Sequence, residues 1–591
     1  MKIKVSDYIA KRLKEVYGVD RFFMVSGGGA MHLNDSLGRY ISYTCNHNEQ
    51  ACAIAAEGYA RVNQKMAVVN VTTGPGGLNC LNGVFGQWTD SVPVLYISGQ
   101  VKRRTLMSSF PDLKVRQLGD QEADIISVVK PLTKYAATVT EPNDIKYHLD
   151  RAIYEATTGR FGPCWIDVPI DVQAAVIDEA ELKEFDKSNY NTKAVCGFEF
   201  CVSKLKEAKR PLIIAGHGIR LAGRIDNFKS LVNALKIPVV TTFNGMDILE
   251  SDNPYYIGRI GTVGQRAGNF ALQNADLILC LGTRNNIRQV SYNWENFAKN
   301  AYKIVVDIDE NELNKPLVAP DMAVCADLKD FISTIAKSLS DLAIQNDWLE
   351  FCQNLKEKYS FEKHPESEQK VDIINPYYFT YTLTKCLSEG NVFVMANGSA
   401  CVCTFQNAVI KPNQRFILNS GNASMGYGLP CAIGACYQTD NRVVCLEGDG
   451  SIMMNLQELQ TVVHNKLPIK LFIINNNGYS SIRQTQRNFF DGNMTGSGVD
   501  SGVSVSDFVK VAQAFGLKTK RIENPKSMED DIKEVLDCNE AIVCEVMTEK
   551  EYAFLPKLSS KKLPDGTMVS PTLEDMYPFL TREEFEENIL R

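Results

Sequence analysis

The chain has 591 residues, of which 45% are hydrophobic and 23% charged, and a formal net charge of −7. This composition is that of a globular protein of three or four domains, at ~100–200 residues per domain. Acidic and basic residues are interspersed, which argues against a nucleic-acid binder, and no apolar run approaches the ~20 residues that cross a membrane.

The N-terminal segment, residues 1–19, has the character of an amphipathic helix. Val5, Ile9, Leu13 and Val16 fall on one face of that helix. A signal peptide would need a long apolar core and a cleavage site of small residues, which this segment does not have. The 17 cysteines are scattered through apolar runs and form no paired framework. We therefore predict a cytoplasmic protein with reduced cysteines.

Short apolar runs bounded by Gly, Pro or Asn alternate with longer stretches of helical periodicity. This alternation is typical of βαβ units and predicts parallel sheets. The expected strands form three groups: residues 66–73, 94–99 and 164–169; residues 212–216, 239–242, 277–282 and 304–309; and residues 392–398, 443–448, 470–475 and 541–546.

Polar segments at residues 178–192 and 350–371 separate the three groups and are predicted linkers. The predicted fold class is α/β, with three doubly wound parallel-sheet domains followed by a tail without strand signals. The predicted domains comprise residues 1–178, 193–345 and 372–548, and the tail comprises residues 549–591.

The most informative stretch joins two predicted strands of the third domain. The first strand ends at Gly448, followed by Asp449 and Gly450, and the second ends just before Asn476. Ligands of open parallel sheets bind beyond the carboxyl ends of strands, so these side chains are expected at one edge. A carboxylate, an amide oxygen and the backbone carbonyl of Gly478 suit magnesium, which takes its other oxygens from phosphates and water.

Each of these motifs alone also fits an ordinary turn, because short motifs have many false matches. Their joint occurrence at two strand ends favours a metal site. Together they resemble the signature of thiamine diphosphate-dependent enzymes. The resemblance implies that Asp449, Asn476 and the Gly478 carbonyl hold magnesium on the diphosphate of that cofactor.

The resemblance extends to the segment SGNASMGYGLPCAIGA, in which Met425 matches the residue that wedges between the two rings of the cofactor. Core packing is the alternative role for Met425. By the same resemblance, further residues are expected to line the cofactor: Gly27, Gly76, Asn79, Gly398, Ser399, Ser424, Gly448, Gly450, Ser451 and Tyr479.

A single carboxylate precedes an alanine-rich helix in the first domain, within CNHNEQACAIAAEGYARV. Glu49 matches the glutamate that, in the family, hydrogen-bonds the pyrimidine ring and activates the cofactor. An acidic residue at a helix N-terminus is also favoured by the helix dipole without any catalytic role. Because different subunits bind the pyrimidine and the diphosphate in the family, the resemblance implies a homodimer or homotetramer with active sites at the subunit interface.

The stretches VTTGPGGLNCLNGVFGQWTDSVPVLYISGQ and GDQEADII resemble acetolactate synthases in particular, and the resemblance covers nearly the whole chain. It implies that Gln121 is a second catalytic residue. It also implies that a 2-oxo acid, with pyruvate preferred, is decarboxylated and its two-carbon unit is transferred to an acceptor carbonyl. A 2-oxo acid decarboxylase or oxidase is an alternative, as is a non-catalytic regulatory subunit, which would be expected to lose Glu49 or a metal ligand.

Acetolactate synthases bind FAD in the middle domain. Arg284 and Arg288 match the R-x-x-x-R motif of that group, and Asp309 and Asp327 fall in further matching segments. The aspartate-rich centre of the arginine motif is replaced by Asn-Asn-Ile. A FAD site and a structural Rossmann-like domain without a cofactor both fit this pattern.

Departures from the acetolactate synthase pattern cluster at the expected acceptor pocket. A phenylalanine is replaced by Asp120, a hydrophobic residue by Ser481 and a tryptophan by Thr485, with Arg483 nearby. A tryptophan buries ~150–250 Å², so its loss enlarges the pocket, and the new polar groups favour a polar partner. A keto sugar of polysaccharide biosynthesis, linked to a nucleotide, fits, and the basic tail with Lys557 would close over it. Ordinary acetolactate synthesis for branched-chain amino acids, with a solvated tail, is the alternative.

Overall fold

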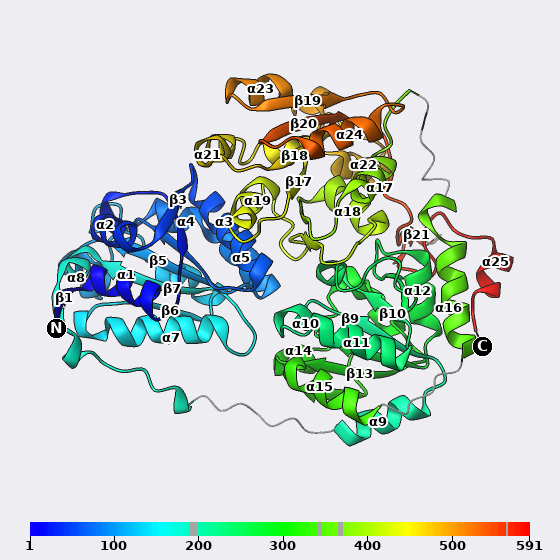
Figure 1. The fold of residues 1–591 in the computed structure, drawn as a ribbon, viewed down its shortest axis with the longest axis horizontal. Helices are drawn as coiled ribbons and strands as arrows, with labels where there is room; N and C mark the ends of the chain where they lie inside the picture. The colour runs from blue at the N-terminus through cyan, green and yellow to red at the C-terminus, as the bar shows by residue number, and fades with distance from the viewer. Residues whose placement is uncertain (190–197, 340–345, 364–369, 371, 563–564, 591) are drawn as a thin grey trace.

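Three α/β units follow one another along the chain (Figure 1). The computed structural model describes residues 1–189, 198–339, 346–363, 370, 372–562 and 565–590. Each unit is built on a six-stranded parallel sheet, which confirms the predicted fold class. Among the described residues, every helix is too short or too polar to span a lipid bilayer.

The sheet of the first unit has the order β3-β2-β4-β5-β7-β6. Its strands, in chain order, are β2 (Arg21–Met24), β3 (Ser42–Cys45), β4 (Ala67–Val71), β5 (Val94–Gln100), β6 (Tyr135–Thr138) and β7 (Cys164–Pro169). One face packs on α3 (Glu49–Asn63) and α5 (Leu81–Asp90), and the other on α1 (Val5–Glu15), α2 (Met31–Tyr40) and α7 (Ile145–Thr157). Phe22 and Phe23 therefore point to opposite cores, as the alternation of side chains along a strand requires.

The sheet of the central unit has the order β11-β10-β9-β12-β13-β14. Its strands are β9 (Pro211–Ala215), β10 (Val239–Thr241), β11 (Tyr256–Arg259), β12 (Leu277–Leu281), β13 (Tyr302–Asp307) and β14 (Met322–Cys325). One face packs on α9 (Phe198–Glu207), α11 (Ile225–Leu235) and α15 (Leu328–Ser338), and the other on α12 (Arg266–Asn274) and α16 (Asn346–Lys358). Counted within the unit, the order is 3-2-1-4-5-6, that of dinucleotide-binding sheets.

The sheet of the third unit has the order β16-β15-β17-β18-β20-β19. Its strands are β15 (Val392–Met395), β16 (Arg415–Ile417), β17 (Val443–Gly448), β18 (Lys470–Asn475), β19 (Lys518–Ile522) and β20 (Ile542–Met547). One face packs on α19 (Gly428–Cys436), α21 (Glu458–Asn465) and α23 (Phe508–Ala514), and the other on α17 (Pro376–Cys386), α18 (Gly398–Asn407) and α24 (Met528–Asp537). Counted within each unit, the first and third sheets share the order 2-1-3-4-6-5.

The first and third units pack through α3 and α19, which lie side by side (Figure 1). Their apolar residues belong to one continuous core that reaches both sheets. A Cβ on Gly58 would lie 2.0 Å from the carbonyl oxygen of Cys431, and a Cβ on Gly434 would lie 1.8 Å from that of Ala55. The backbones of the two helices therefore touch at a crossing that only glycine permits.

The central unit docks on both neighbours through specific contacts. The ring of Phe243 stacks on that of Phe405 in the third unit, with the ring centroids 3.7 Å apart. Arg160 of the first unit pairs with Asp309 and Glu312 of the central unit, both at 2.8 Å.

Every run predicted as a strand carries one, although several bounds shift by a residue or two. The predicted linker at residues 350–371 begins instead inside α16, whose Trp348 and Leu355 are buried against the central unit. Val16 lies just after α1 and is exposed, so the predicted apolar face is wrong at that residue.

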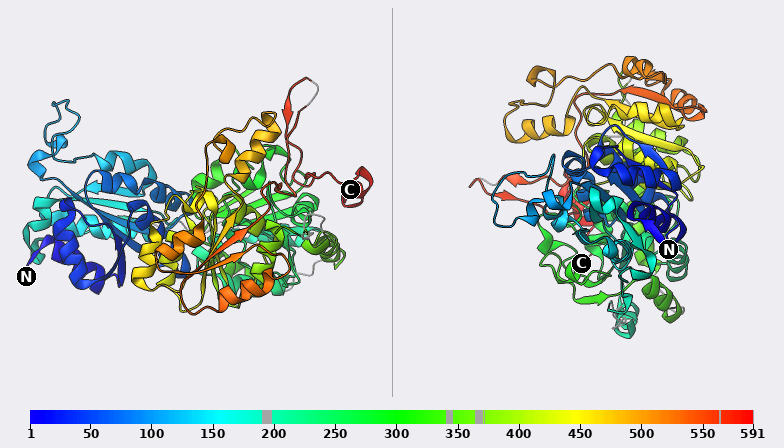
Figure 2. Two further views of the ribbon diagram at one scale, coloured as in Figure 1. Left: turned by 90° about the horizontal axis from the view of Figure 1, so that it is seen from above. Right: turned by 90° about the vertical axis from the view of Figure 1, so that its left-hand side faces the viewer.

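The tail contains two short strands that its sequence did not signal, β21 (Lys561–Lys562) and β22 (Met568–Val569), followed by α25 (Arg582–Glu587). The hairpin of β21 and β22 projects from the same face as the loop of residues 101–120 (Figure 2). Phe585 of α25 packs on the central unit.

Gly58→Ala should destabilise the protein, because its methyl group would collide with the backbone of α19. Overpacking of this kind costs ~1–3 kcal/mol, so the midpoint of thermal unfolding should fall. Gly38→Ala is the matched control, since it also lies within a helix but its Cβ would meet only Tyr43, at 3.5 Å. That control should be neutral or stabilising, by up to about 1 kcal/mol. Equal midpoints for Gly58→Ala and the wild type would contradict the crossing described above.

Candidate functional site

Two loops meet where the strand order of the third unit reverses, between β15 and β17. In open parallel sheets this is the crevice where ligands bind. Helix α18 begins at Gly398, with φ +58°, directly after β15, so its free N–H groups, starting near Ser399, lie at this edge and favour an anion. A Cβ on Gly448, at the end of β17, would meet nothing nearer than 4.0 Å, which leaves room for a ligand.

Asp449 follows β17 and is held by backbone donors. The N–H groups of Asn476 and Gly478 donate to its Oδ2 at 3.0 and 2.9 Å, and the N–H of Gly450 donates to Oδ1 at 2.6 Å. The residue is only 2% exposed. Burial raises the pKa of Asp449 to about 6, and the backbone donors oppose that rise. One buried carboxylate is thereby fixed between the ends of β17 and β18.

The neighbouring amide supplies a second oxygen. Oδ1 of Asn476 is buried and has no hydrogen-bond partner among the described residues, a costly state that marks it as an acceptor kept for a ligand. With Asp449 and the Gly478 carbonyl it forms a set of hard oxygen donors that suits magnesium bound to a diphosphate. The described part of the chain contains no group of three or more His, Cys, Asp or Glu residues that could hold a metal. The three residues predicted as metal ligands lie together at the ends of β17 and β18.

Arg483, on α22 (Ser480–Phe489), holds the loop that carries these donors. Its guanidinium donates to the carbonyl oxygens of Asn476, Asn477, Ser497 and Lys550 at 2.9 to 3.1 Å. The sequence placed this arginine beside an acceptor pocket. The structure places it behind the metal loop instead, where it fixes four backbone carbonyls.

Two tyrosines complete the wall of the crevice. The ring of Tyr479 covers Gly450, where a Cβ would come within 2.2 Å of the ring. The hydroxyl of Tyr552, from the tail, lies 3.3 Å from Nδ2 of Asn476 and contacts Oγ of Ser399. Sequence reasoning missed Tyr552, because nothing in the tail sequence signals that it returns to this site.

The loop that carries Met425 is tied to the same crevice. The N–H of Gly426 donates to Oγ of Ser451 at 2.9 Å, and the N–H of Ser424 donates to Oδ1 of Asn419 at 3.1 Å. Met425 itself is half-buried. The wedge residue expected from the sequence therefore lies directly beside the helix that begins with Asp449.

A second cluster occupies the equivalent reversal point of the first unit, between β2 and β4. Nδ2 of Asn79 donates to Oε2 of Glu49 at 3.0 Å. A Cβ on Gly76 would lie 3.6 Å from Oε1 of Glu49 and 2.9 Å from Thr72, and Gly27 also packs against Thr72. The structure thus brings together Glu49, Gly76, Asn79 and Gly27, as the sequence predicts.

The residues predicted for the acceptor pocket lie in two places. Asp120 and Gln121 are exposed in the first unit, and Gln121, at φ +59°, packs its carbonyl against Gly74. Ser481 and Thr485 lie on α22 of the third unit, where the Thr485 hydroxyl donates to the Ser481 carbonyl at 3.1 Å. Within the described residues, no hydrogen bond or ion pair joins the two sets. The residues predicted for the acceptor pocket therefore lie on two different units of the chain.

The central unit has a cleft of about 1090 Å³ at its own reversal point, between β9 and β12. Arg284 and Asp327 line this cleft, together with Gly218 and Gly282. The loops of these two glycines lie so close that a Cβ on Gly218 would be 2.7 Å from Cα of Gly282. Packing between loops therefore accounts for the GHG motif without any ligand.

Three of the four residues predicted for this unit, Asp309, Asp327 and Arg288, have partners within the protein. Asp309 caps α14 (Glu310–Asn314), and Asp327 caps α15, each accepting a backbone N–H. Arg288 lies over the ring of Phe243, 4.8 Å from its centroid. Of the four predicted residues, only Arg284 and Asp327 line the cleft.

A crevice lined by oxygen donors on one sheet and a glutamate at the equivalent place on another are features expected of an enzyme that uses a diphosphate cofactor. Comparison with known proteins agrees. Models of the thiamine pyrophosphate enzyme N-terminal TPP binding domain, central domain and C-terminal TPP binding domain match residues 3–126, 198–335 and 396–546.

The acetolactate synthase large subunit of Lactococcus lactis is 32% identical over 94% of both chains. Isozyme 2 of Escherichia coli is 31% identical over 88% of this chain and 90% of its own, and a probable large subunit of Methanocaldococcus jannaschii is 29% identical over 99% and 98%. The chain belongs to the thiamine pyrophosphate enzyme family, within its acetolactate synthase-like carboligases.

Arg483→Met should weaken the binding of thiamine diphosphate about 10–100-fold, because residues that orient metal ligands have effects of that size. Titration of the apoprotein with cofactor at fixed magnesium measures the change. Arg487→Met is the matched control, since Arg487 lies one turn further along α22 and pairs with the carboxylate of Glu551. Equal affinities for the two variants would remove Arg483 from this role.

Proposed function

We propose that the protein is a thiamine diphosphate- and magnesium-dependent carboligase that decarboxylates pyruvate or a related 2-oxo acid and transfers the two-carbon unit to an acceptor carbonyl. The pair of half-sites at equivalent points of two like-ordered sheets carries this proposal, with Glu49 at one and Asp449 with Asn476 at the other. When bound, thiamine diphosphate supplies the carbon nucleophile and the electron sink.

The chain's own residues have distinct parts in this proposal. Asp449 and Asn476 hold the magnesium, and the N-terminus of α18 meets the charge of the diphosphate. Met425 would contact the cofactor from the third unit. Glu49, oriented by Asn79 at 3.0 Å, would hold the proton that the pyrimidine ring needs. Gln121 contacts the substrate from the first unit.

We propose further that the active site forms between two copies, in a homodimer or a homotetramer. Exposed apolar side chains flank both half-sites: Leu78, Phe85 and Trp88 near Asn79, and Met453 and Met454 just after Ser451. Apolar groups exposed beside a functional site are typical of an interface. The described cysteines are all free, which favours a reducing compartment such as the cytoplasm.

Glu49→Gln and Asp449→Asn should each lose most activity, by about 10²-fold or more, because each removes a group without which the chemistry stops. Glu49→Gln should still bind the cofactor. If active sites form between copies, mixing and refolding the two variants together restores partial activity, since a mixed dimer has one intact site. Activity that stays absent in the mixture while mixed dimers form would contradict the shared site.

The acceptor is proposed to be a keto sugar linked to a nucleotide. Thr485 and Ser481 leave a polar, open surface on α22, and Nζ of Lys557 from the tail reaches Gln484 of that helix at 3.2 Å. Burial lowers the pKa of Lys557. The side chains of Lys561 and Lys562 lie outside the described part of the structure.

A loop beside Gln121 adds a basic surface on the same face as the tail hairpin (Figure 2). Arg104, Lys114 and Arg116 are exposed in it. Glu122 anchors the loop by accepting the N–H groups of Met107, Leu118 and Gly119 at 2.6, 3.4 and 2.9 Å. Exposed arginines and lysines on an anchored loop suit the diphosphate of a nucleotide sugar.

Acetolactate synthesis is the second candidate, favoured by the names of the relatives above. The purified enzyme should therefore be given pyruvate alone and pyruvate with a nucleotide 4-keto sugar, with products identified by mass spectrometry. The proposal expects a coupled sugar product that exceeds acetolactate. It also expects Thr485→Trp to reduce sugar coupling and spare acetolactate formation, because the indole refills the pocket. Rapid acetolactate formation unaffected by the sugar would exclude the sugar acceptor.

The cleft of the central unit is proposed as a flavin site. Its size, its place at the reversal point of a 3-2-1-4-5-6 sheet and the half-buried guanidinium of Arg284 on its wall support FAD. The native protein should then release FAD on denaturation, at one molecule per chain, and Arg284→Ala should reduce that yield. Release of no flavin from a protein that is active with thiamine diphosphate and magnesium alone, without added FAD, would favour the structural role.

A further inference from the structure

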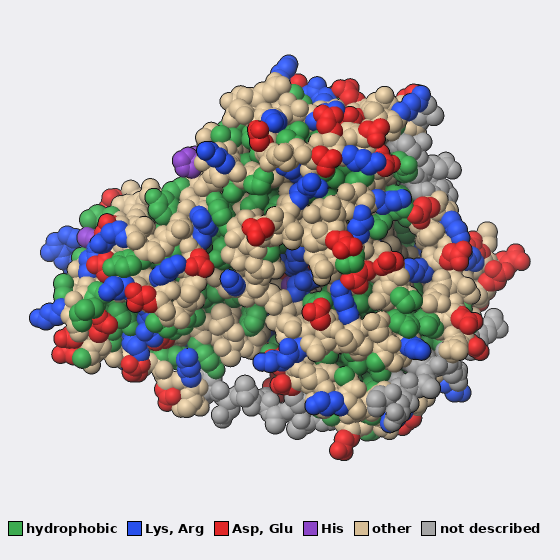
Figure 3. All heavy atoms as spheres, in the orientation of Figure 1, with side chains coloured by type: hydrophobic (Ala, Val, Ile, Leu, Met, Phe, Trp, Pro, Cys, Tyr) green, Lys and Arg blue, Asp and Glu red, His purple; other side chains and the backbone are tan. Residues whose placement is uncertain are grey.

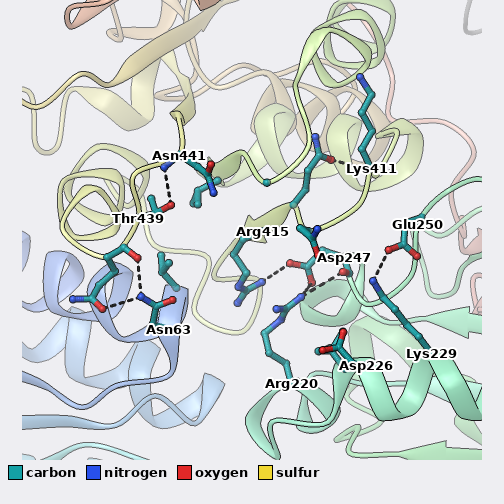
Figure 4. A pocket seen from close by; sticks show the side chains of 17 residues that line it. Asn63, Arg220, Asp226, Lys229, Asp247, Glu250, Lys411, Arg415, Thr439 and Asn441 are labelled. Atoms are coloured by element: carbon teal, nitrogen blue, oxygen red, sulfur yellow. Dashed lines mark hydrogen bonds and ion pairs between the residues drawn. The ribbon is translucent and has the colours of Figure 1, made fainter.

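A second cavity, of about 250 Å³, lies where the three units meet (Figure 4). Its wall includes Val392 and Arg415, the first residues of β15 and β16, and Asn441, just before β17. These positions are at the amino ends of the strands whose carboxyl ends carry the metal crevice. The cavity is therefore separated from the active site by the length of the sheet. Figure 3 shows a hollow with basic side chains at this junction.

Two arginines from different units converge on one carboxylate beside this cavity. Arg415 donates from Nη1 to Oδ2 of Asp247 at 2.7 Å, and Nη2 of Arg220 lies 3.0 Å from Oδ1. A third arginine, Arg61, lies near enough to lower the pKa of Arg415. Burial is the first cause of that shift, which brings the pKa of Arg415 to about 10, with Arg220 contributing as well. Because Arg61 is itself paired with Glu57 and Asp90, the two arginines that converge on Asp247 exceed that carboxylate by one positive charge.

Each of the two arginines also has one donor nitrogen without a hydrogen-bond partner among the described residues. Nη2 of Arg415 and Nε of Arg220 are buried and have no hydrogen-bond partner in the described part of the chain. Arg415 is only 5% exposed. A buried charged donor without an acceptor is costly, so an anion in the cavity would gain these donors if the two side chains shift toward it.

The remaining wall is polar and slightly basic. Lys229 pairs with Glu250, and Lys411 donates to the carbonyl oxygens of Lys385 and Leu387, both at 2.6 Å. Of the lining residues, Arg220, Lys229, Lys411 and Arg415 are basic, and Asp226, Asp247 and Glu250 are acidic, an excess of one positive charge. Asn63, Gln414 and Asn441 add amides. The cavity is smaller than the ~300–1,000 Å³ of sites for drug-sized ligands, which excludes a nucleotide or a second cofactor.

We propose that this cavity is a binding site for a small oxyanion, a phosphate or the carboxylate of a small metabolite, held between Arg220 of the central unit and Arg415 of the third. Guanidinium groups bind both kinds of anion through paired N–H donors. A bound anion would join the central and third units at a point far from the chemistry. The site therefore couples the concentration of that anion to the stability of the domain arrangement.

The test uses the full-length holoenzyme with saturating thiamine diphosphate and magnesium, so that added anions cannot report on the crevice at Asp449. Inorganic phosphate and malonate are titrated separately, with binding measured by calorimetry and unfolding by its midpoint. Saturable binding of either anion with a raised midpoint supports the proposal. Response to phosphate alone identifies a phosphate site, and response to malonate alone identifies a carboxylate site. Saturable binding of neither anion would overturn it.

Variants at the rim of the cavity locate the binding without disturbing the buried arginines. Lys229→Met removes a lining cation and should weaken binding about tenfold, whereas Asp226→Asn removes an exposed acid and should strengthen it. Lys236→Met is the control, since Lys236 is an exposed cation at the end of the same helix and does not line the cavity. Anion binding that is the same in all three variants would place it elsewhere and overturn the proposal.

Discussion

The contact between α3 and α19 is the constraint on which the rest of the structure depends. Gly58 and Gly434 let the two backbones touch, and the apolar residues around them form one core that continues into both sheets. Interiors packed this closely respond to a single added methyl group. Close packing in the helix pair therefore sets the relative position of the first and third units. It thereby also fixes the position of the crevice of one unit relative to that of the other.

Charged side chains are stabilised in different ways at the edges of the sheets and at the junctions between units. At the crevice of the third unit, Asp449 is stabilised by backbone N–H groups, and the guanidinium of Arg483 donates hydrogen bonds to backbone carbonyls. At the junctions, side chains of opposite charge meet, as between Arg160 and Asp309 or between Arg415 and Asp247. Backbone donors keep a site rigid without adding a competing charge, whereas ion pairs between units tolerate small changes in domain position.

The sequence predicts the fold best where strands are buried on both faces. All of the predicted strands exist, and within the three six-stranded sheets those that it missed are β2 and the strands at the edges. Central strands of a parallel sheet read as continuous apolar runs, but edge strands such as β19, with the sequence KTKRI, do not. Asp449 and Asn476 could be predicted because topology brings the ends of neighbouring strands to one edge, and Gly76 is predicted from the family resemblance. Arg483 and Tyr552 could not, since their partners are backbone atoms or residues distant in the chain.

The donor set of the metal crevice carries one formal negative charge, on Asp449, because Asn476 and the Gly478 carbonyl are neutral. A divalent cation held there would keep half of its charge uncompensated by the protein. The anionic ligand must supply the remainder, so each partner raises the affinity of the crevice for the other by the same factor. Such a site would bind the free ion weakly and would respond to the ion and the diphosphate together.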